Sequence, residues 1–352
     1  MIKHHEILKH EVTVTKEASF WRQLLVSPRF YFAFLFIQVF ILATFISTRN
    51  FTNYDPMLVI KDQKVQEELF NNTGEHCLAW NTSEPAPETK CAIISPYLIG
   101  YRKPVISDEI NWEDTLQKYN SVRCGGRFRP SNCKARQKVA LLIPFRDRYE
   151  HLKIFIHHIH PFLMRQQLEY GIYIIDLDER IQFNRGLLLN VAFLEASKEF
   201  DYDCYIFHDV DLLPENDYNL YRCSDLPRHM SVAVDKFNYK LPYVEIFGGV
   251  SAMTKEQILF VNGFSNKFSG WGGEDDDMYN RLKFRHMTVL RSMNDVSKYT
   301  MLKHKQSPPN PKRFKLISTG MKRVGKDGVK NLKYKVMKRT DYPLYTYVKI
   351  TL

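Results

Sequence analysis

The sequence predicts an α/β fold whose sheet is largely parallel, preceded by a single N-terminal transmembrane helix. Two observations predict it. Short apolar runs typical of buried strands alternate with segments of helical period between residues 139 and 211, and one longer uncharged apolar run lies near the N-terminus. With 352 residues, 44% of them hydrophobic, the chain can bury one sizeable core or two modest ones.

The uncharged apolar run covers residues 30–47, about the minimum length for a membrane span. A buried core helix and a cleaved signal peptide are the alternatives. Against the signal peptide, residues 1–29 are polar or mixed, and no small-residue cleavage site follows the run. Residues 1–29 hold five Lys or Arg against three Glu, which predicts a cytoplasmic tail and a luminal remainder.

Residues 48–90 are polar, include Pro85 and Pro87, and are expected to form a luminal stem before an ordered domain at 91–352. Three glycosylation sequons support the luminal side, at Asn50, Asn71 and Asn81. Six cysteines, all beyond the apolar run, fit an oxidising compartment. A cytosolic zinc site is the alternative, but the sequence has no Cys-x2-Cys pair.

The ordered domain begins with alternating elements. We expect strands at 139–145, 170–176 and 204–211, and helices at 151–164 and 187–196. Such alternation is typical of a largely parallel sheet with helical crossovers. Ligands of these sheets collect at the carboxyl ends of the strands, so residues after each strand are candidates for a site.

The net charge of +11 is concentrated in one segment. Residues 311–340 contain eleven Lys or Arg and one Asp, so this segment contributes +10 and the rest is nearly neutral. That distribution argues against a nucleic-acid-binding surface spread over the domain. A solvated basic face, or contact with an anionic lipid or a phosphorylated substrate, remains open.

An Asp-x-Asp pair follows the expected strand at 204–211. In an extended chain Asp209 and Asp211 point to the same side, so both carboxylates can face one divalent cation bound to a diphosphate. The pattern is weak evidence, because it also occurs at 176–178 and 201–203.

A glycine-rich acidic segment, GWGGEDDD, occupies residues 270–277. One interpretation is a turn followed by the acidic first turn of a helix, with Met278 and Leu282 beginning its apolar stripe. The other is a mobile flap around Trp271 beside a carboxylate that serves as general base. Composition does not choose between them.

Six strings resemble the β-1,4-galactosyltransferase family, in the order of that family. They are IPFRDR (143–148), FNRGLLLNVAF (183–193), DVDLLPENDYNLYRC (209–223), FGGVSAM (247–253), GWGGEDDDMYNRL (270–282) and NPKRF (310–314). The resemblance covers 91–352 and implies a Rossmann-like GT-A fold, a Golgi location with a type II anchor, and an inverting transferase. One stretch, 176–185, departs from the family pattern.

The resemblance also implies roles for particular residues. A Mn2+ ion would be held by Asp211, Met301 and His304. Asp275 would be the catalytic base and Glu274 would support the donor sugar. The UDP-sugar site would comprise Pro144, Phe145, Arg146, Arg148, Phe183, Arg185, Asp209, Val210, Lys236, Ile246, Gly249 and Trp271. The acceptor, a terminal N-acetylglucosamine of a glycoprotein or glycolipid, would meet Tyr243, Trp271, Asp275, Asp276, Arg313, Phe314 and Ile317.

The family pattern further implies the disulfides Cys91–Cys133 and Cys204–Cys223, which leaves Cys77 and Cys124 for a third bridge. Two loops, around the metal-binding Met and His and around Trp271, are expected to close over bound donor. The sequence indicates no particular protein partner.

The donor sugar depends on Ile246, just before FGG. Vertebrate members of the family carry a tyrosine there, against C2 of the donor galactose, and the smaller Ile246 leaves room for an acetamido group. The chain most resembles the invertebrate β-1,4-N-acetylgalactosaminyltransferases, which carry Ile or a similar aliphatic residue at this position, so the resemblance implies UDP-GalNAc as donor. UDP-Gal is the alternative donor, with Ile246 an ordinary core residue at a strand end. A catalytically silent sugar-binding or chaperone-like protein is the alternative of another class, although the expected metal and base residues are all present.

Overall fold

The computed structural model describes residues 56–71, 77–79, 87–107, 110–305 and 307–352. One compact unit runs from Lys61 to Leu352. The other unit, Met1–Ile60, is described only from Pro56 on, where helix α3 begins. The compact unit therefore begins before Cys91, and α3, Pro56–Asn71, lies within the stretch expected to be a polar stem.

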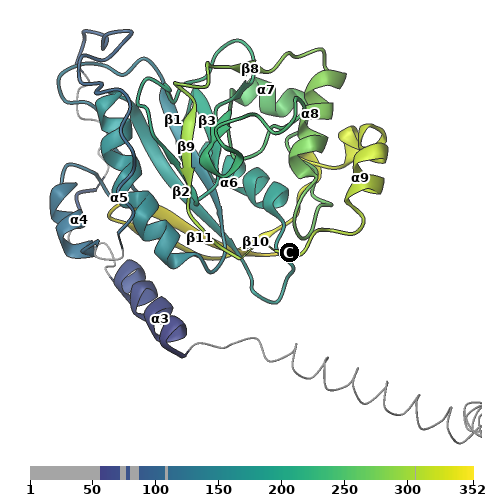
Figure 1. Ribbon diagram of the computed structural model, residues 1–352, viewed down its shortest axis with the longest axis horizontal. Helices are drawn as coiled ribbons and strands as arrows, with labels where there is room; N and C mark the ends of the chain where they lie inside the picture. The colour runs from purple at the N-terminus through teal and green to yellow at the C-terminus, as the bar shows by residue number, and fades with distance from the viewer. Residues whose placement is uncertain (1–55, 72–76, 80–86, 108–109, 306) are drawn as a thin grey trace, which may run out of the picture. The chain divides into compact units, whose positions relative to one another are not determined.

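An eight-stranded mixed sheet forms the centre of the compact unit (Figure 1). Its strands are β1 Lys138–Phe145, β2 Glu169–Leu177, β3 Cys204–His208, β5 Arg228–His229, β7 Val250–Met253, β8 Leu290–Arg291, β10 Lys335–Tyr342 and β11 Tyr345–Thr351. Their order is β10-β11-β2-β1-β3-β7-β5-β8. The four central strands β11, β2, β1 and β3 are parallel, whereas β10 and β7 join antiparallel to their neighbours. The expected α/β class is confirmed, but the sheet is mixed.

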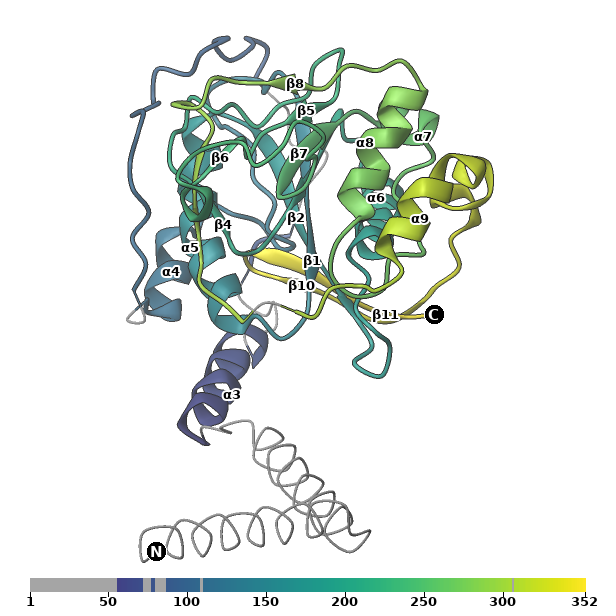
Figure 2. The same cartoon turned by 45° about the vertical axis from the view of Figure 1, so that its right-hand side comes forward.

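The central strands are apolar throughout because both faces of the sheet are covered. Val139 and Leu141 of β1 belong to one hydrophobic cluster, with α5, whereas Ala140 and Leu142 belong to a second cluster, with α6. Alternate residues of a strand point to opposite faces, so a continuous apolar run can serve both clusters. Helices α5 and α6 accordingly lie on opposite sides of the sheet (Figure 2).

The expected helices at 151–164 and 187–196 are confirmed as α5 and α6. The helices are α4 Trp112–Lys118, α5 Tyr149–Arg165, α6 Arg185–Glu199, α7 Lys255–Phe260, α8 Glu274–Phe284 and α9 Arg313–Thr319. Short 3-10 turns are η1 Asp235–Phe237, η2 Gly320–Lys322, η3 Val324–Lys326 and η4 Val329–Asn331. A small second sheet has the order β4-β9-β6 and consists of β4 Leu212–Pro214, β6 Ala233–Val234 and β9 Lys298–Met301.

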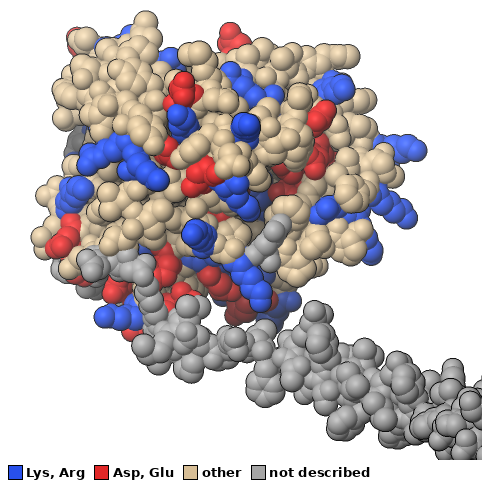
Figure 3. Space-filling view, viewed as in Figure 1, with Lys and Arg blue, Asp and Glu red and all other residues tan. Residues whose placement is uncertain are grey.

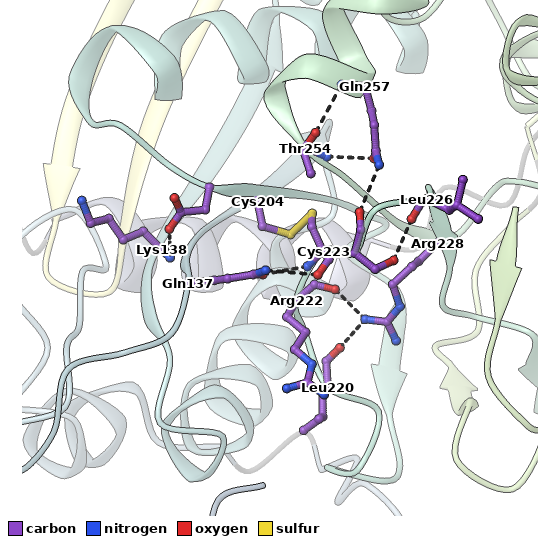
Figure 4. Close-up of a disulfide and its surroundings, with 12 residues drawn as sticks. Gln137, Lys138, Cys204, Leu220, Arg222, Cys223, Leu226, Arg228, Thr254 and Gln257 are labelled. Carbon is purple, nitrogen blue, oxygen red and sulfur yellow. Dashed lines mark hydrogen bonds between the residues drawn. A yellow bond between two sulfur atoms is a disulfide. The ribbon is translucent and has the colours of Figure 1, made fainter. Parts of the chain in front are cut away.

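Three disulfides close the N-terminal and central parts of the unit. Cys91–Cys133 and Cys204–Cys223 confirm the expected pairs, and the third joins Cys77 to Cys124. In Figure 4 the side chain of Gln137 accepts from the backbone N–H of Cys223 at 2.8 Å and donates to its carbonyl at 3.1 Å. The Cys204–Cys223 bridge thus anchors the loop after β4 to the start of β3.

Several expectations fall on residues that the structure does not describe. The predicted span, 30–47, and the sequons at Asn50 and Asn81 lie outside the described residues, and Asn71 is the last residue of α3. Within the described part of the chain, no helix combines the length and the apolar character needed to cross a membrane.

Candidate functional site

The Asp-x-Asp pair lies at the carboxyl end of β3, where ligands of such sheets collect. The chain turns here, since the N–H of Leu212 donates to the carbonyl of Asp209 at 3.2 Å. The two carboxylates therefore have different partners, contrary to the expectation for an extended chain. Asp209 Oδ1 lies 2.6 Å from Arg185 Nε, and Asp211 Oδ2 lies 2.9 Å from His304 Nε2.

Pairing between β4 and β9 brings the three segments that carry the expected metal ligands side by side. Met301 pairs with Leu212, the neighbour of Asp211, and the N–H of Leu302 donates to the carbonyl of Asp211 at 2.8 Å. His304 follows β9 and its imidazole contacts the Asp211 carboxylate. This hydrogen bond with Asp211 raises the pKa of His304. A carboxylate oxygen and an imidazole nitrogen that converge at one point fit a divalent transition metal, and Met301 lies three residues before His304 on the neighbouring strand.

A thioether among the ligands makes the site hard to recognise from residue types. In the described residues, no group of three His, Cys, Asp or Glu side chains is placed to hold a metal ion. Asp235, which sequence reasoning missed, supports the site because its Oδ1 accepts from the N–H of Met301 at 2.9 Å. Its position beside Lys236 was the signal that could have drawn attention to it.

Two arginines expected at the nucleotide have different surroundings. Arg148 lies beside the metal candidates, with a terminal nitrogen 2.9 Å from His304 Nδ1. Arg146 donates instead to the carbonyls of Leu177, Asp178 and Ile181 at 2.7 to 3.0 Å. Its guanidinium also lies over the ring of Phe183. Arg146 therefore shapes the segment after β2, which is the stretch that departs from the family pattern.

The other expected nucleotide residues surround the same strand ends. Pro144 and Phe145 are the buried last residues of β1, and Val210 is buried between the two aspartates. Lys236, on η1, has its ammonium group 5.8 Å from the centre of the Phe237 ring. Its ammonium is close to no described carboxylate that would neutralise it by an ion pair.

Arg185 joins two motifs that are far apart in the sequence. It begins α6, and its guanidinium contacts Asp209 at 2.6 Å and Glu274 at 3.4 Å. Burial raises the pKa of Asp209 to about 6, against the opposing effect of Arg185. One cation thus holds the Asp-x-Asp turn next to the acidic start of α8.

The acidic segment does begin a helix, as one interpretation predicted. Helix α8 starts at Glu274, and Gly273 precedes it with a φ of 97°, a conformation that glycine adopts without strain. A methyl group added to Gly248 would lie 2.6 Å from Asp275 Oδ2, so a side chain at this position would displace this carboxylate. The FGG segment therefore passes directly against Asp275.

The electrostatic environment of Asp275 suits a general base. Burial, together with the negative charges of the neighbouring Glu274 and Asp276, raises its pKa to about 7. A base with a pKa near the working pH combines a useful deprotonated fraction with a strong affinity for the proton.

The expected acceptor residues cluster around α8 and α9. The hydroxyl of Tyr243 donates to Asp276 Oδ1 at 3.0 Å. The guanidinium of Arg313 lies over the rings of Trp271 and Phe314, both of which are well exposed. Exposed aromatic faces held by a cation can stack on the apolar side of a sugar ring. Ile317 is half-buried on α9.

Ile246 lies in the segment leading to the FGG glycines. It is half-buried, while the adjacent Phe247 is fully buried. The carbonyl of Ile246 accepts from Arg291 at 2.9 Å. Ser231 supports the following turn, since its hydroxyl accepts from the N–H of Val250 and donates to the carbonyl of Gly248. Neither Arg291 nor Ser231 was expected from the sequence.

Comparison with known proteins agrees with this arrangement. Residues 91–224 match the N-terminal region of glycosyl transferase group 7, and residues 228–305 match a family described as the N-terminal domain of galactosyltransferase. Bovine β-1,4-galactosyltransferase 1 is 46% identical over 280 residues, covering 77% of this chain and 70% of the relative. The chain belongs to the β-1,4-galactosyltransferase family. Chinese hamster (Cricetulus griseus) β-1,4-galactosyltransferase 4 is 44% identical over 310 residues, covering 85% of this chain and 90% of the relative.

Solved structures of the β-1,4-galactosyltransferase family show the same fold. The catalytic domain of Drosophila β-1,4-galactosyltransferase 7 in complex with xylobiose has a TM-score of 0.54 and 34% identity, covering 61% of this chain and 94% of that one. A mutant of that enzyme in complex with manganese, UDP-Gal and xylobiose has a TM-score of 0.52 and 32% identity, over the same shares. Membership of this family supports a β-1,4-hexosyltransferase.

Proposed function

We propose that this chain is an inverting, Mn2+-dependent transferase that moves GalNAc from UDP-GalNAc to the 4-hydroxyl of a terminal β-GlcNAc. The β-1,4-hexosyltransferase part follows from family membership, and UDP-Gal is the alternative donor. The observation that carries the proposal is the double contact of Arg185, which joins Asp209 of the nucleotide site to Glu274, the neighbour of the candidate base Asp275.

Asp211, Met301 and His304 would hold Mn2+, whose charge offsets the negative charge that develops on the departing UDP. A Drosophila relative in complex with manganese and UDP-Gal supports this choice of ion. Arg148 and Lys236 supply further positive charge for the diphosphate.

Asp275 performs the proton transfer. Its carboxylate accepts the proton of the acceptor 4-hydroxyl while that oxygen bonds to the anomeric carbon and the bond from this carbon to the UDP oxygen breaks. A single displacement from the opposite face converts an α-linked donor into a β-linked product. Trp271 and Phe314 hold the acceptor ring, and Tyr243 orients the neighbouring Asp276.

The metal assignment is tested by Asp211→Asn and His304→Ala. Each removes one ligand, and we expect loss of Mn2+-dependent transfer without unfolding, because His304 and Asp211 keep 19% and 13% of their side-chain surface exposed and neither packs in a hydrophobic cluster. The matched control is Asp201→Asn, in another Asp-x-Asp pair, whose side chain is 89% exposed. Near-normal activity of Asp211→Asn or His304→Ala at limiting Mn2+ would refute the assignment.

The choice of UDP-GalNAc rests on the size of Ile246. It precedes by two positions the glycine that packs against Asp275, so its backbone lies near the reacting end of the site. A hydrophobic pocket rejects a larger substituent by steric clash, and an aliphatic residue in place of tyrosine relieves that clash.

The donor is tested with the full-length chain, Mn2+ and a GlcNAc-terminated acceptor, with UDP-GalNAc and UDP-Gal in parallel. We expect a higher kcat/KM for UDP-GalNAc, and Ile246→Tyr should shift the preference toward UDP-Gal. Higher kcat/KM for UDP-Gal in the unmodified chain would contradict the donor assignment and leave the hexosyltransferase intact. Transfer from neither donor would favour the silent sugar-binding alternative.

We also propose a Golgi type II topology, with a cytoplasmic tail at 1–29, a membrane anchor at 30–47, a stem at 48–90 and a luminal catalytic domain at 91–352. The luminal side is supported by the three disulfides, which form in oxidising compartments. Asn50, Asn71 and Asn81 should then carry glycans. Protease digestion of intact microsomes checks the topology. We expect the part of the chain after the anchor to be protected and residues 1–29 to be digested, and protection of residues 1–29 alone would contradict the proposed orientation.

A further inference from the structure

The basic segment 311–340 is divided by the fold into two parts. Its last residues form β10, an edge strand of the sheet, where Lys335 and Lys338 are exposed. Lysines on edge strands commonly prevent pairing with another chain, so these two have an ordinary explanation. The first part, 311–333, comprises α9 and the turns η2, η3 and η4, and has no such explanation.

Within 311–333, the arginines and the acid are used internally. Arg313 stacks on Trp271 and Phe314. Asp327 is buried and contacts Arg281 and Arg323. The only acidic side chain of this part is therefore turned inward and neutralised.

The lysines of the same part remain exposed. They have no ion-pair partner among the residues that the structure describes, and we call them the lysine surface: Lys312, Lys315, Lys322, Lys326, Lys330 and Lys333. Figure 3 shows Lys and Arg side chains along the right-hand margin, where Figure 1 places α9. The surface thus carries a concentrated positive charge that the fold itself does not use.

The lysine surface adjoins the acceptor end of the candidate site. Lys312 and Lys315 flank Arg313 and Phe314, and α9 and η2 both pack on α8, which carries Asp275. A group attached to a bound acceptor sugar would therefore extend over or beside these lysines. Charges within about 8 Å interact appreciably at physiological ionic strength.

We infer that the lysine surface binds an anionic polypeptide segment next to the glycan of the acceptor. The inference rests on the proposed function, because it takes α9 to lie at the acceptor site. Carboxylates of Asp and Glu and the phosphate of phosphoserine share the required chemistry, since ammonium groups bind such anions as point charges. The surface would select acceptors by KM, because the lysines are not among the groups that act on the reacting atoms.

An anionic membrane is a less suitable partner. Helices that lie in a membrane interface combine basic residues with several exposed large apolar ones. Between residues 311 and 333, Phe314 is the one large hydrophobic residue that is strongly exposed, at 70%, and it already belongs to the acceptor cluster. The surface has charge but little to insert into lipid.

The test compares three glycopeptides that carry the same GlcNAc-terminated glycan, flanked by Glu, by phosphoserine or by Gln. The full-length chain should show a KM about threefold to tenfold lower for the anionic peptides than for the Gln peptide, with equal kcat. The preference should disappear at high salt and in Lys315→Gln/Lys322→Gln. The matched control, Lys335→Gln/Lys338→Gln on β10, should retain it.

Two results would overturn the inference: equal KM values for all three peptides in the unmodified chain, or loss of the preference for anionic peptides in the β10 control. Transfer to the Gln peptide would still support the proposed function in either case. If Lys315→Gln/Lys322→Gln altered KM only in nanodiscs containing phosphatidylserine, and not in neutral nanodiscs, the surface would serve a membrane. A lower KM for the phosphoserine peptide alone would identify phosphate as the recognised group, and a lower KM for both the Glu and the phosphoserine peptides would identify negative charge in general. Either result supports the inference. Loss of transfer to every peptide would instead count against the proposed function.

Discussion

Arg281 on α8 is fully buried and holds two acidic side chains below the candidate catalytic residues. Its Nε lies 2.7 Å from Asp277 Oδ2, and another guanidinium nitrogen lies 3.6 Å from Asp327 Oδ2. It also donates to the carbonyls of Gly263 and Asp327 at 3.0 and 2.9 Å. This one side chain therefore ties α8 to two other segments.

Arg281→Met keeps much of the volume and removes the charge. The one described cation left near Asp277 and Asp327 would be the partly exposed Arg323, at 4.0 and 3.4 Å. Asp327 would keep its hydrogen bonds from the hydroxyl of Ser265 and the N–H of Asn266. Removing one partner of a buried ion pair costs about 3 to 5 kcal/mol of unfolding free energy. For a domain of this size that lowers Tm by about 6 to 20 °C. Lys283→Met, exposed on the same helix, is the control and should leave Tm nearly unchanged.

The loss of stability should also depend on pH. Burial already raises the pKa of Asp277, and Arg281 opposes that increase, so the pKa should rise further in Arg281→Met. A carboxyl group whose pKa is raised by folding destabilises the folded state when ionised, and this penalty is relieved as the pH falls through the folded pKa. The Tm deficit relative to the unmodified chain should thus be larger at pH 8 than at pH 5. A deficit under about 2 °C, or one equal at both pH values, would refute this reasoning.

Three further predictions concern the site and its frame. Asp275 must be ionised to accept a proton and has a pKa of about 7, so kcat/KM should fall below that pH. Asp275→Asn should lose at least about 100-fold in activity without lowering Tm, because it removes a carboxylate that is unfavourable when ionised in the folded state. Gly273→Ala places a methyl group 2.9 Å from Phe268 at a φ of 97°, so Tm and kcat should both fall, and an unchanged Tm would contradict the strain. Replacing Cys204 and Cys223 by Ser should lower the free energy of unfolding, measured with urea, by about 3 kcal/mol, because the bridge restricts the unfolded chain. An unchanged free energy of unfolding would contradict this reasoning.

Much of the candidate site could be predicted because its residues lie in contiguous motifs. The helix beginning at Glu274 followed from the glycines before it and the acids within its first turn. The turn at Asp209 and Asp211 was expected to be extended, because alternation along an expected strand is a local rule and the strand ends earlier, at His208. The role of Arg146 in holding backbone carbonyls was also not predictable, since nothing near it in sequence indicates where residues 177–181 will lie.

By itself the sequence determined the alternating strands and helices between residues 139 and 211, the acidic motif that follows the strand at Cys204–His208, and the cysteines available for bridges. These are properties of neighbouring residues, set by periodicity and by glycine and carboxylate chemistry. Tertiary structure alone decided that Arg185 meets both Asp209 and Glu274, and that β9 and the residues after it bring Met301 and His304 to Asp211. It also decided that Asp327 is buried, while the lysines of 311–333 have no ion-pair partner in the described part of the chain. The physical reason is that these contacts depend on the sheet order and register, which bring distant segments together through many weak interactions that no short stretch of sequence contains.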